Sequence, residues 1–355
     1  MARQREGKAM KPGDRKPTIN DVARLAGVSI KTVSRVINKE PNVRDEVRER
    51  VLRATTQLGY RPNFSARSLA GQRSYLVGYL FGDAGGDYAH RVEVGILDRC
   101  RAAGYHLLVE QIDAAAPDVA ERTAALVTQL RLDGVVLTPP ITDHADVLRV
   151  LREVGVPYVR IAPDRHDDVS PFVEIDDEAA ACELTTHLIG LGHRRIGFIK
   201  GDPGHAAARL RYDGFCRALR EHGLELQPAF IGQGDFSYAS GLAAARGLLR
   251  GDQRPSAVFA GNDDMAAAVI AVAHEAGLRV PGELSVVGFD DAPIAGVVWP
   301  PLTTVRQPIV RMAETAAELL LTRAAPKRGG EAGETPPRHR LAYEICLRRS
   351  TAPPA

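Results

Sequence analysis

The chain changes its hydrophobic period once, near residue 75. Before that point apolar residues recur every three or four positions, which is the spacing of amphipathic helices. We expect two short helices on either side of a turn at Gly27, the second with Ser29 as its N-cap, and a third helix over residues 45–58. The apolar stripes of these helices are Ile19, Val22, Ala23 and Ala26; Val33, Val36 and Ile37; and Val47, Val51, Ala54 and Leu58. This pattern predicts a helix-turn-helix unit.

After residue 75, runs rich in β-branched residues alternate with amphipathic helical stretches, which is typical of parallel sheets covered by helices. Strands are expected at residues 76–81, 105–109, 135–137, 158–161, 196–199, 257–260, 285–289 and 341–347. Helices in the second half are expected at residues 178–191, 206–222, 239–249 and 263–276. The predicted fold is an all-α helix-turn-helix head plus an α/β body of two lobes, each a doubly wound parallel sheet.

Composition shifts give the domain boundaries. Residues 1–17 are rich in Lys, Arg, Gly and Pro without periodicity, which predicts a disordered basic arm. Residues 18–62 form the predicted helix-turn-helix domain, and residues 63–74 a hinge and linker whose segment 64–71 is too short to be a stable helix alone. The body is expected over residues 75–350, with an N-lobe of residues 75–174 and 306–336 and a C-lobe of residues 175–305 and 337–350.

Charge separates the same two parts. The formal net charge of the chain is +2, but residues 1–75 carry 17 Lys and Arg against 7 Asp and Glu, whereas the remainder carries 29 against 37. A basic head on an acidic body predicts that the head binds a polyanion and that the body does not; the alternative is a solvated basic tail.

Several classes of protein are disfavoured by what the sequence lacks. No apolar run has the length of a membrane helix, and residues 1–16 do not resemble a signal peptide, so no membrane partner is expected. The four cysteines are scattered without metal-ligand spacing, so no metal or cofactor is expected. Dinucleotide, P-loop, hydrolase-elbow and zinc-protease motifs are missing, which argues against an enzyme.

The segment from Thr18 to Asn38 resembles the signature of the LacI/GalR family of transcription regulators at nearly every position. The resemblance continues through Leu58-Gly59-Tyr60, Pro62-Asn63 and the run Ala66-Arg67-Ser68-Leu69, and it extends with lower density to about Arg306. It therefore covers most of the chain, and it joins the head, the hinge and a matching sensor domain.

A helix that opens at Ser29 enters the major groove by its N-terminal end, so the side chains able to reach base edges are Ile30, Lys31 and Arg35. Lys31 and Arg35 offer donors suited to guanine, and Ile30 offers apolar contact. Small polar residues are better placed for the DNA backbone, and these are Thr18, Ser29, Thr32, Ser34 and Asn38.

The resemblance also implies a hinge helix that forms only on DNA and lies in the minor groove. Its expected residues are Asn63, Ala66, Arg67 and Leu69. Leu69 matches the side chain that wedges into a base step, where unstacking is compensated by the contacts of a bent duplex. The alternative for Leu69 is a small hydrophobic cluster with its alanine neighbours.

The body resembles a periplasmic sugar-binding protein, so its ligand is expected between the lobes, at the carboxyl ends of the strands. The positions that match effector-binding residues of the family are Arg211, Asn262, Asp290 and Phe236. Many relatives have an acidic residue at the end of the strand that matches Tyr158–Ile161, but this chain has Arg160 there and Asp164 just after. Whether Arg160 or Asp164 makes the contact is open. We take Arg160 as a candidate pocket residue, with a surface strand charge as its alternative.

Together these features predict a cytoplasmic homodimer that binds a palindromic operator and represses sugar-utilisation genes until a sugar binds between the lobes. The lobes alone also fit a sugar-binding receptor of a transport system, which would not bind DNA.

Overall fold

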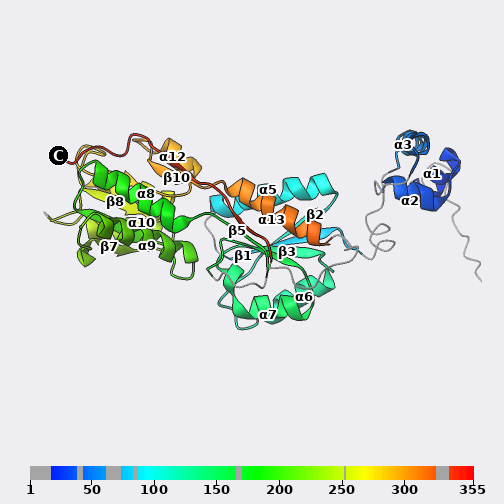
Figure 1. Ribbon diagram of the computed structural model, residues 1–355, viewed down its shortest axis with the longest axis horizontal. Coiled ribbons are helices and arrows are strands. Elements are labelled where there is room, and N and C mark those ends of the chain that lie inside the picture. Colours follow the sequence, from blue (N-terminus) through cyan, green and yellow to red (C-terminus); the bar gives the residue numbers. More distant parts are fainter. Residues whose placement is uncertain are drawn as a thin grey trace, which may run out of the picture. The chain divides into compact units, whose positions relative to one another are not determined.

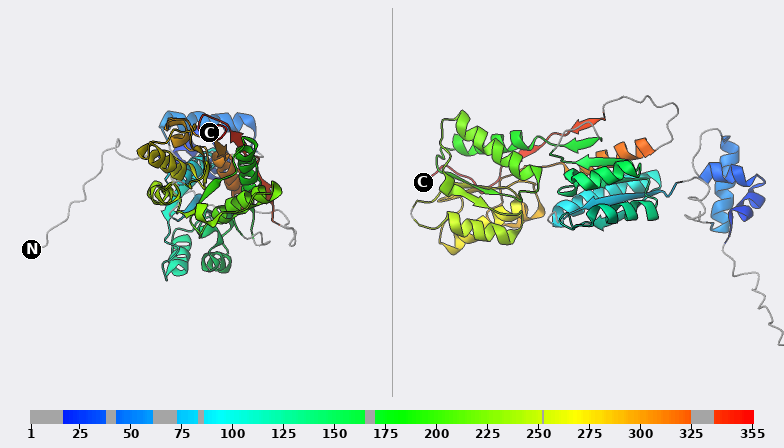
Figure 2. Two further views of the ribbon diagram at one scale, coloured as in Figure 1. Left: turned by 90° about the vertical axis from the view of Figure 1, so that its left-hand side faces the viewer. Right: turned by 90° about the horizontal axis from the view of Figure 1, so that it is seen from below.

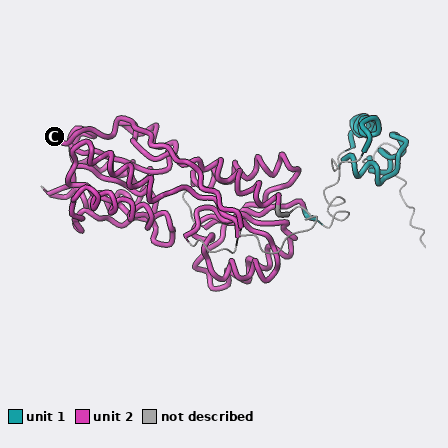
Figure 3. The backbone as a smooth tube through the Cα atoms, in the orientation of Figure 1, with its two compact units in different colours: residues 1–74 teal, residues 75–355 magenta. Residues whose placement is uncertain are grey.

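The computed structural model describes residues 17–37, 43–60, 73–82, 86–164, 170–251, 253–324 and 336–355. The chain forms two compact units, residues 1–74 and 75–355 (Figures 1 and 3). The expected basic arm falls almost wholly outside the described residues, and so do Asn38 and the hinge residues Asn63, Ala66, Arg67 and Leu69.

The first unit contains the three predicted helices: α1 (Ile19–Ala26), α2 (Ile30–Ile37) and α3 (Asp45–Leu58). The Asp21 carboxylate accepts hydrogen bonds from the backbone N–H and the hydroxyl of Thr18, at 2.9 and 2.7 Å, which fixes the start of α1. Gly27 ends α1 with a φ of 64°, a conformation that glycine adopts without strain. The expected apolar stripes meet in one core, made of Val22, Ala23, Ala26, Val33, Val36, Val51 and Ala54.

The first lobe of the second unit is a six-stranded parallel sheet with the strand order β11-β5-β4-β3-β1-β2. Helices α5 and α13 pack together on one face of this sheet, and α6 and α7 lie on the other (Figure 1). The elements of this lobe are β1 (Leu76–Phe81), α5 (Gly86–Ala103), β2 (His106–Gln111), α6 (Val119–Gln129), β3 (Gly134–Leu137), η1 (Ile141–Asp143), α7 (Ala145–Glu153), β4 (Tyr158–Ile161), β5 (Phe172–Glu174), α13 (Ile309–Ala324) and β11 (Arg338–Arg340).

The second lobe is a four-stranded parallel sheet with the order β7-β6-β8-β9, again between two layers of helices (Figure 2). Helix α8 packs on α9, and α10 packs on α11. The elements of this lobe are α8 (Asp177–Gly190), β6 (Ile196–Lys200), α9 (Ala206–Glu221), η2 (Pro228–Phe230), β7 (Ile231–Gln233), α10 (Tyr238–Leu248), β8 (Ala257–Ala260), α11 (Asp263–Glu275), β9 (Ser285–Val287) and α12 (Pro293–Val297).

The chain passes between the lobes three times: after β5, before α13 and after β11. Two of these passages lie beside an antiparallel ribbon of β10 (Thr304–Arg306) and β12 (Glu344–Cys346). The strand predicted over residues 341–347 is present as the shorter β12, but the prediction that the second lobe resumes at residue 337 was wrong. Residues 338–340 pair with β5 in the first lobe, and residues 344–346 pair with β10, because the residues between them carry the chain across.

Within the described ranges, no helix combines the length and the hydropathy needed to cross a membrane.

The contact between α8 and α9 depends on Gly214. A Cβ built on Gly214 would lie 2.2 Å from the backbone oxygen of Glu178 in α8, so Gly214→Ala must push the helices apart. We expect Gly214→Ala to lower the free energy of unfolding by about 1–3 kcal/mol, as overpacking does. Thermal unfolding measured by calorimetry tests this expectation.

The matched control is Gly247→Ala in α10, because a Cβ at Gly247 meets no atom within 4 Å. The control should leave the melting temperature unchanged or raise it, since alanine is the better helix former. Equal melting temperatures for Gly214→Ala and the wild type would contradict the packing argument.

Candidate functional site

Helix α2 presents the predicted base-reading residues to solvent. Its N-terminus is capped by Ser29, whose Oγ accepts a hydrogen bond from the backbone N–H of Thr32 at 3.1 Å. Lys31 and Arg35 are exposed, and Ile30 is 50% exposed although it is apolar. Val33 and Val36, by contrast, are buried against α1 and α3. The outward face of α2 is therefore exposed to solvent, whereas its inward face packs in the core of the head.

The four described residues expected at the DNA backbone lie at the starts of α1 and α2 or on α2 itself. Ser29 is exposed, and Thr18, Thr32 and Ser34 are partly exposed. Thr18 and Ser29 both take part in helix capping, as the bonds above show. Thr18 and Ser29 thus each help to fix the start of a helix and still face solvent.

In the second unit a pocket lies between the two lobes, beside the carboxyl ends of strands. The predicted residues Arg211, Asn262, Asp290 and Phe236 all line it, although they come from four separate segments of the second lobe. The first lobe and the passages between the lobes complete the wall. The remaining lining residues are Asp87, Tyr88, Pro139, Ala162, Asp177, His205, Ala207, Asp264, Ala292, Gln307 and Ile309.

Arg211 lines the pocket and is 5% exposed. Its Nε donates to Oδ1 of Asp177 at 2.8 Å, and its Nη1 donates to the backbone oxygen of Gly261 at 2.7 Å. Its Nη2 lies 3.4 Å from Oδ1 of Asp290, and the guanidinium covers the ring of Phe289 at 3.7 Å. Burial opposes the charge of Arg211, but Asp290 and Asp177 outweigh it and raise the pKa of the guanidinium.

Asn262 caps α11 and fixes the loop that carries Phe236. Its Oδ1 accepts a hydrogen bond from the backbone N–H of Met265 at 3.0 Å, and its Nδ2 donates to the backbone oxygen of Phe236 at 2.8 Å. Phe236 has a φ of 72°, which is uncommon for a bulky residue. A Cβ on Gly201 would overlap the Phe236 ring, so glycine is required there for the ring to lie along the pocket.

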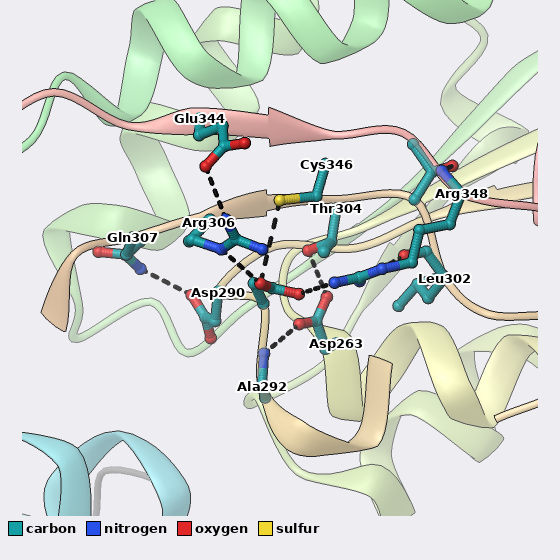
Figure 4. A network of polar contacts seen from close by, with 12 residues as sticks. Asp263, Asp290, Ala292, Leu302, Thr304, Arg306, Gln307, Glu344, Cys346 and Arg348 are labelled. Atoms are coloured by element: carbon teal, nitrogen blue, oxygen red, sulfur yellow. Dashed lines mark hydrogen bonds and ion pairs between the residues drawn. The ribbon is translucent and has the colours of Figure 1, made fainter. Parts of the chain in front are cut away.

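Asp290 lies three residues beyond the end of β9, which stops at Val287 rather than at the predicted residue 289. Its φ is 110°, so the chain leaves the extended conformation and turns the carboxylate into the pocket. Gln307 donates to Oδ1 of Asp290 at 2.7 Å (Figure 4). Burial raises the pKa of Asp290 to about 6, against the opposing effect of Arg211.

A polar network holds this turn in place (Figure 4). Asp263 accepts from the hydroxyl of Thr304 at 2.6 Å and from the backbone N–H of Ala292 at 2.7 Å. Asp291 turns away from Asp290 and accepts from Arg306 at 2.7 Å and from Arg348. Burial alone would raise the pKa of Asp291, but the two arginines bring it below its usual value. The adjacent aspartates therefore have different surroundings. Asp290 faces the pocket, and Asp291 faces the passages between the lobes.

Arg160 is a correction to the expected site. The structure places it in β4 with no exposed surface, and it is not among the residues that line the pocket. Its Nε donates to Oγ of Ser170 at 2.9 Å, and its Nη1 lies 3.5 Å from Oδ1 of Asp143. These hydrogen-bonding partners hold the guanidinium inside the first lobe. Arg160 is therefore neither a pocket residue nor a surface charge.

Asp164 does not line the pocket either, but it connects the lobes. Its carboxylate forms an ion pair with Arg209 of α9, and its backbone N–H donates to Asp143 at 2.7 Å. A second connection comes from Arg91 of α5, whose Nη1 donates to the backbone oxygens of Asp290 and Asp291 at 3.2 and 3.4 Å. The lobes are therefore joined by two separate sets of polar contacts.

Sequence reasoning missed several lining residues. Asp87 and Tyr88 begin α5, shortly after β1 ends, and the rule that ligands lie at the carboxyl ends of strands could have found them. Asp264 lies in the first turn of α11, two residues after the predicted Asn262. Gln307 has no sequence signal, because its place depends on how the chain crosses between the lobes.

A helix-turn-helix head followed by a two-lobed body with a pocket between the lobes defines the class of ligand-responsive transcription regulators. Comparison with known proteins agrees. A model described as bacterial regulatory proteins, lacI family, matches residues 18–63, and a periplasmic binding protein-like domain matches residues 185–351.

Similar proteins span nearly the whole chain. Catabolite control protein A of Priestia megaterium is 35% identical over 310 residues, which cover 85% of this chain and 91% of that protein. The ribose operon repressor of Escherichia coli (strain K12) is 34% identical over 306 residues, or 86% of this chain and 92% of that protein.

Solved structures give the same result. The lac repressor dimer bound to operator and the anti-inducer ONPF aligns with a TM-score of 0.78 at 28% identity and covers 95% of this chain and 100% of its own. The complex of the transcriptional regulator CelR with cellobiose aligns with a TM-score of 0.71 at 32% identity, with 94% and 99% covered. The chain belongs to the LacI family, a family of DNA-binding regulators rather than enzymes. The predicted family and fold class are confirmed.

The raised pKa of Asp290 predicts a pH-dependent stability. A carboxyl group that holds its proton more tightly when folded makes the folded state more stable at low pH, so the free energy of unfolding should fall as pH rises from about 4 to about 6. Asp290→Asn removes this contribution, and urea unfolding at a series of pH values measures it.

Asp177 and Asp263 also have raised pKa values, but both remain in the variant. The expected signal is therefore the difference between wild type and Asp290→Asn, which should change across this pH range. A constant difference would show that Asp290 ionises normally.

Proposed function

We propose that this chain is a homodimeric repressor that binds a palindromic operator in the cytoplasm and is released when a sugar fills the pocket. The observation that carries the proposal is a pocket lined by both lobes, in a chain whose head leaves the outer face of α2 exposed. The named complexes of related proteins, with operator DNA and with cellobiose, support the same two activities.

In the head, the proposal assigns base reading to Ile30, Lys31 and Arg35. The DNA backbone is assigned to Thr18, Ser29, Thr32, Ser34 and Asn38, and the minor groove to Asn63, Ala66, Arg67 and Leu69. The exposure of Ile30 supports its role, because contact with a thymine methyl group would remove this apolar side chain from water, which is favourable. The basic charge of residues 1–75 supports attraction to phosphate.

In the pocket, the proposal assigns sugar hydroxyls to Asp290 and Arg211, whose relative positions are fixed by Asp177, Gln307 and the Gly261 carbonyl. Phe236 offers an aromatic face for the apolar side of a sugar ring. Asn262 acts mainly by holding the Phe236 loop, since both ends of its amide are already bonded to the protein.

A ligand that contacts both lobes changes the free-energy difference between the open and closed arrangements of the lobes. The arrangement of the lobes then shifts the equilibrium between the folded and unfolded hinge helix. A coupling of about 1–3 kcal/mol between two sites corresponds to a change in DNA affinity of roughly 5- to 150-fold. The effect needs no contact between sugar and DNA.

The division of labour predicts that Arg35→Ala weakens operator binding by roughly 5- to 150-fold, the usual effect of removing a base-reading arginine. Sugar binding should be unchanged. Fluorescence anisotropy with labelled operator and calorimetry with sugar provide the two readouts. Loss of both activities together would contradict the assignment of Arg35 to DNA alone.

The converse variant is Arg211→Lys, which keeps the charge but not the fork of donors that Asp177 and Gly261 engage. We expect sugar binding to fall by about tenfold or more while operator binding in the absence of sugar is retained. Arg220→Lys, an exposed residue of the same helix outside the pocket, is the control and should bind both ligands normally. If sugar dissociates the operator complex of Arg211→Lys as readily as that of the wild type, the assignment of Arg211 to the sugar site is wrong.

A further inference from the structure

A series of polar contacts runs from the interior of the first lobe to the second lobe. It starts at Arg160, which has no exposed surface and whose Nη1 lies 3.5 Å from Oδ1 of Asp143. The other oxygen of that carboxylate, Oδ2, accepts a hydrogen bond from the backbone N–H of Asp164 at 2.7 Å. The Asp164 side chain then forms its ion pair with Arg209 of α9. A buried charge of one lobe is thus connected, through two aspartates, to a charge of the other lobe.

Arg209 shares its guanidinium between two partners. Its Nη2 donates to Oδ1 of Asp164, and its Nη1 donates to Oδ2 of Asp213 at 2.9 Å. Asp213 belongs to the same helix as Arg209, so this bond does not depend on the arrangement of the lobes. Asp164 belongs to the first lobe, so its bond to Arg209 breaks when the lobes separate at this place.

The ion pair lies beside the pocket. Ala162 and Ala207 line the pocket, one from each lobe, and Asp164 and Arg209 follow them by two residues. The charged groups are themselves on the surface, with 42% of the Asp164 side chain and 55% of the Arg209 side chain exposed. The lobes are therefore tied together next to the pocket, by a bond that is in contact with solvent.

An exposed ion pair between two flexible side chains usually contributes little, because the entropy lost in ordering them offsets the attraction. Here other contacts order both partners: Asp213 holds the guanidinium of Arg209, and Asp143 holds the backbone of Asp164. The buried Arg160 in turn fixes Asp143. Burial of an arginine gives little net stability of its own, since the loss of hydration offsets the attraction to its partners. A positioning role therefore accounts for a charge at this place.

We propose that Asp164 and Arg209 form a latch that holds the lobes together beside the pocket, and that Arg160 and Asp143 are positioning residues that set Asp164 in place. Breaking the latch favours the open arrangement of the lobes, in which the pocket is accessible from solvent. The inference rests on the proposed function only in its consequence, namely that the latch governs the exchange of the effector. The latch itself is independent of any sugar or DNA.

The test measures the arrangement of the lobes in the full-length protein, without effector or DNA. Nitroxide labels are introduced through an unnatural amino acid at two exposed sites, Arg152 of α7 in the first lobe and Arg220 of α9 in the second. Labelled chains are diluted with unlabelled protein, so that pulsed electron paramagnetic resonance gives the distribution of distances within one chain. We expect Asp164→Ala to raise the ratio of open to closed lobes by roughly two- to fivefold, the effect of losing an ordered surface ion pair.

A double-mutant cycle shows whether the effect belongs to the pair. Arg209→Gln should raise the ratio of open to closed lobes as Asp164→Ala does, and the double variant should raise it no further. Glu275→Ala is the matched control, because Glu275 forms an exposed ion pair with Arg246 at 3.3 Å between two helices of the second lobe. The control should leave the ratio unchanged.

Two further measurements separate a latch from a general loss of stability. Asp143→Asn should act like Asp164→Ala, because the amide presents a donor to one of the two donors that the carboxylate accepts. Salt at about 1 M should open the wild type and leave Asp164→Ala almost unchanged, since screening weakens the ion pair. A distance distribution unchanged by Asp164→Ala, or an effect of this variant that persists in Arg209→Gln, overturns the latch. Neither result affects the proposed function, because sugar and operator take no part in the measurement.

Discussion

The buried cluster of Arg211 with Asp177 and Asp290 is the interaction on which the pocket depends. A guanidinium with so little exposed surface is stable only while its partners supply opposite charge and hydrogen bonds. Those partners come from the start of α8 and from the turn after β9, so the cluster fixes three segments of the second lobe relative to one another. Gln307 then links Asp290 to a passage between the lobes. The site and the connection between lobes thus share one set of polar bonds.

Much of this molecule follows from local rules. The helices of the head were predicted almost to the residue, because Thr18, Gly27 and Ser29 give clear start and stop signals and the apolar stripes are complete. Most strands of the body, and its helices α8, α9, α10 and α11, followed from the change in hydrophobic period. The pocket residues Arg211, Asn262, Asp290 and Phe236 came from resemblance to a family, and the structure brings all four to one wall.

The errors have a common physical origin. The three-residue strands β5, β7 and β10 are too short to show a period. The sheet to which residues 338–340 belong is decided by where the chain crosses, which no local pattern records. Arg160 has the right place on a strand but a side chain drawn toward Ser170 and Asp143, and Asp164 joins the other lobe. Side-chain direction at a strand end depends on neighbours far away in sequence.

Strand β1 connects the beginning of the body to the pocket wall. This strand starts at Leu76, immediately after the head unit in sequence, and ends near the pocket wall that Asp87 and Tyr88 help to form. Its six residues span about 20 Å at the usual rise of a strand. If the first lobe pivots about the three passages, a rotation of a few degrees that barely changes the pocket displaces the beginning of β1, where the chain enters the body, by about an ångström.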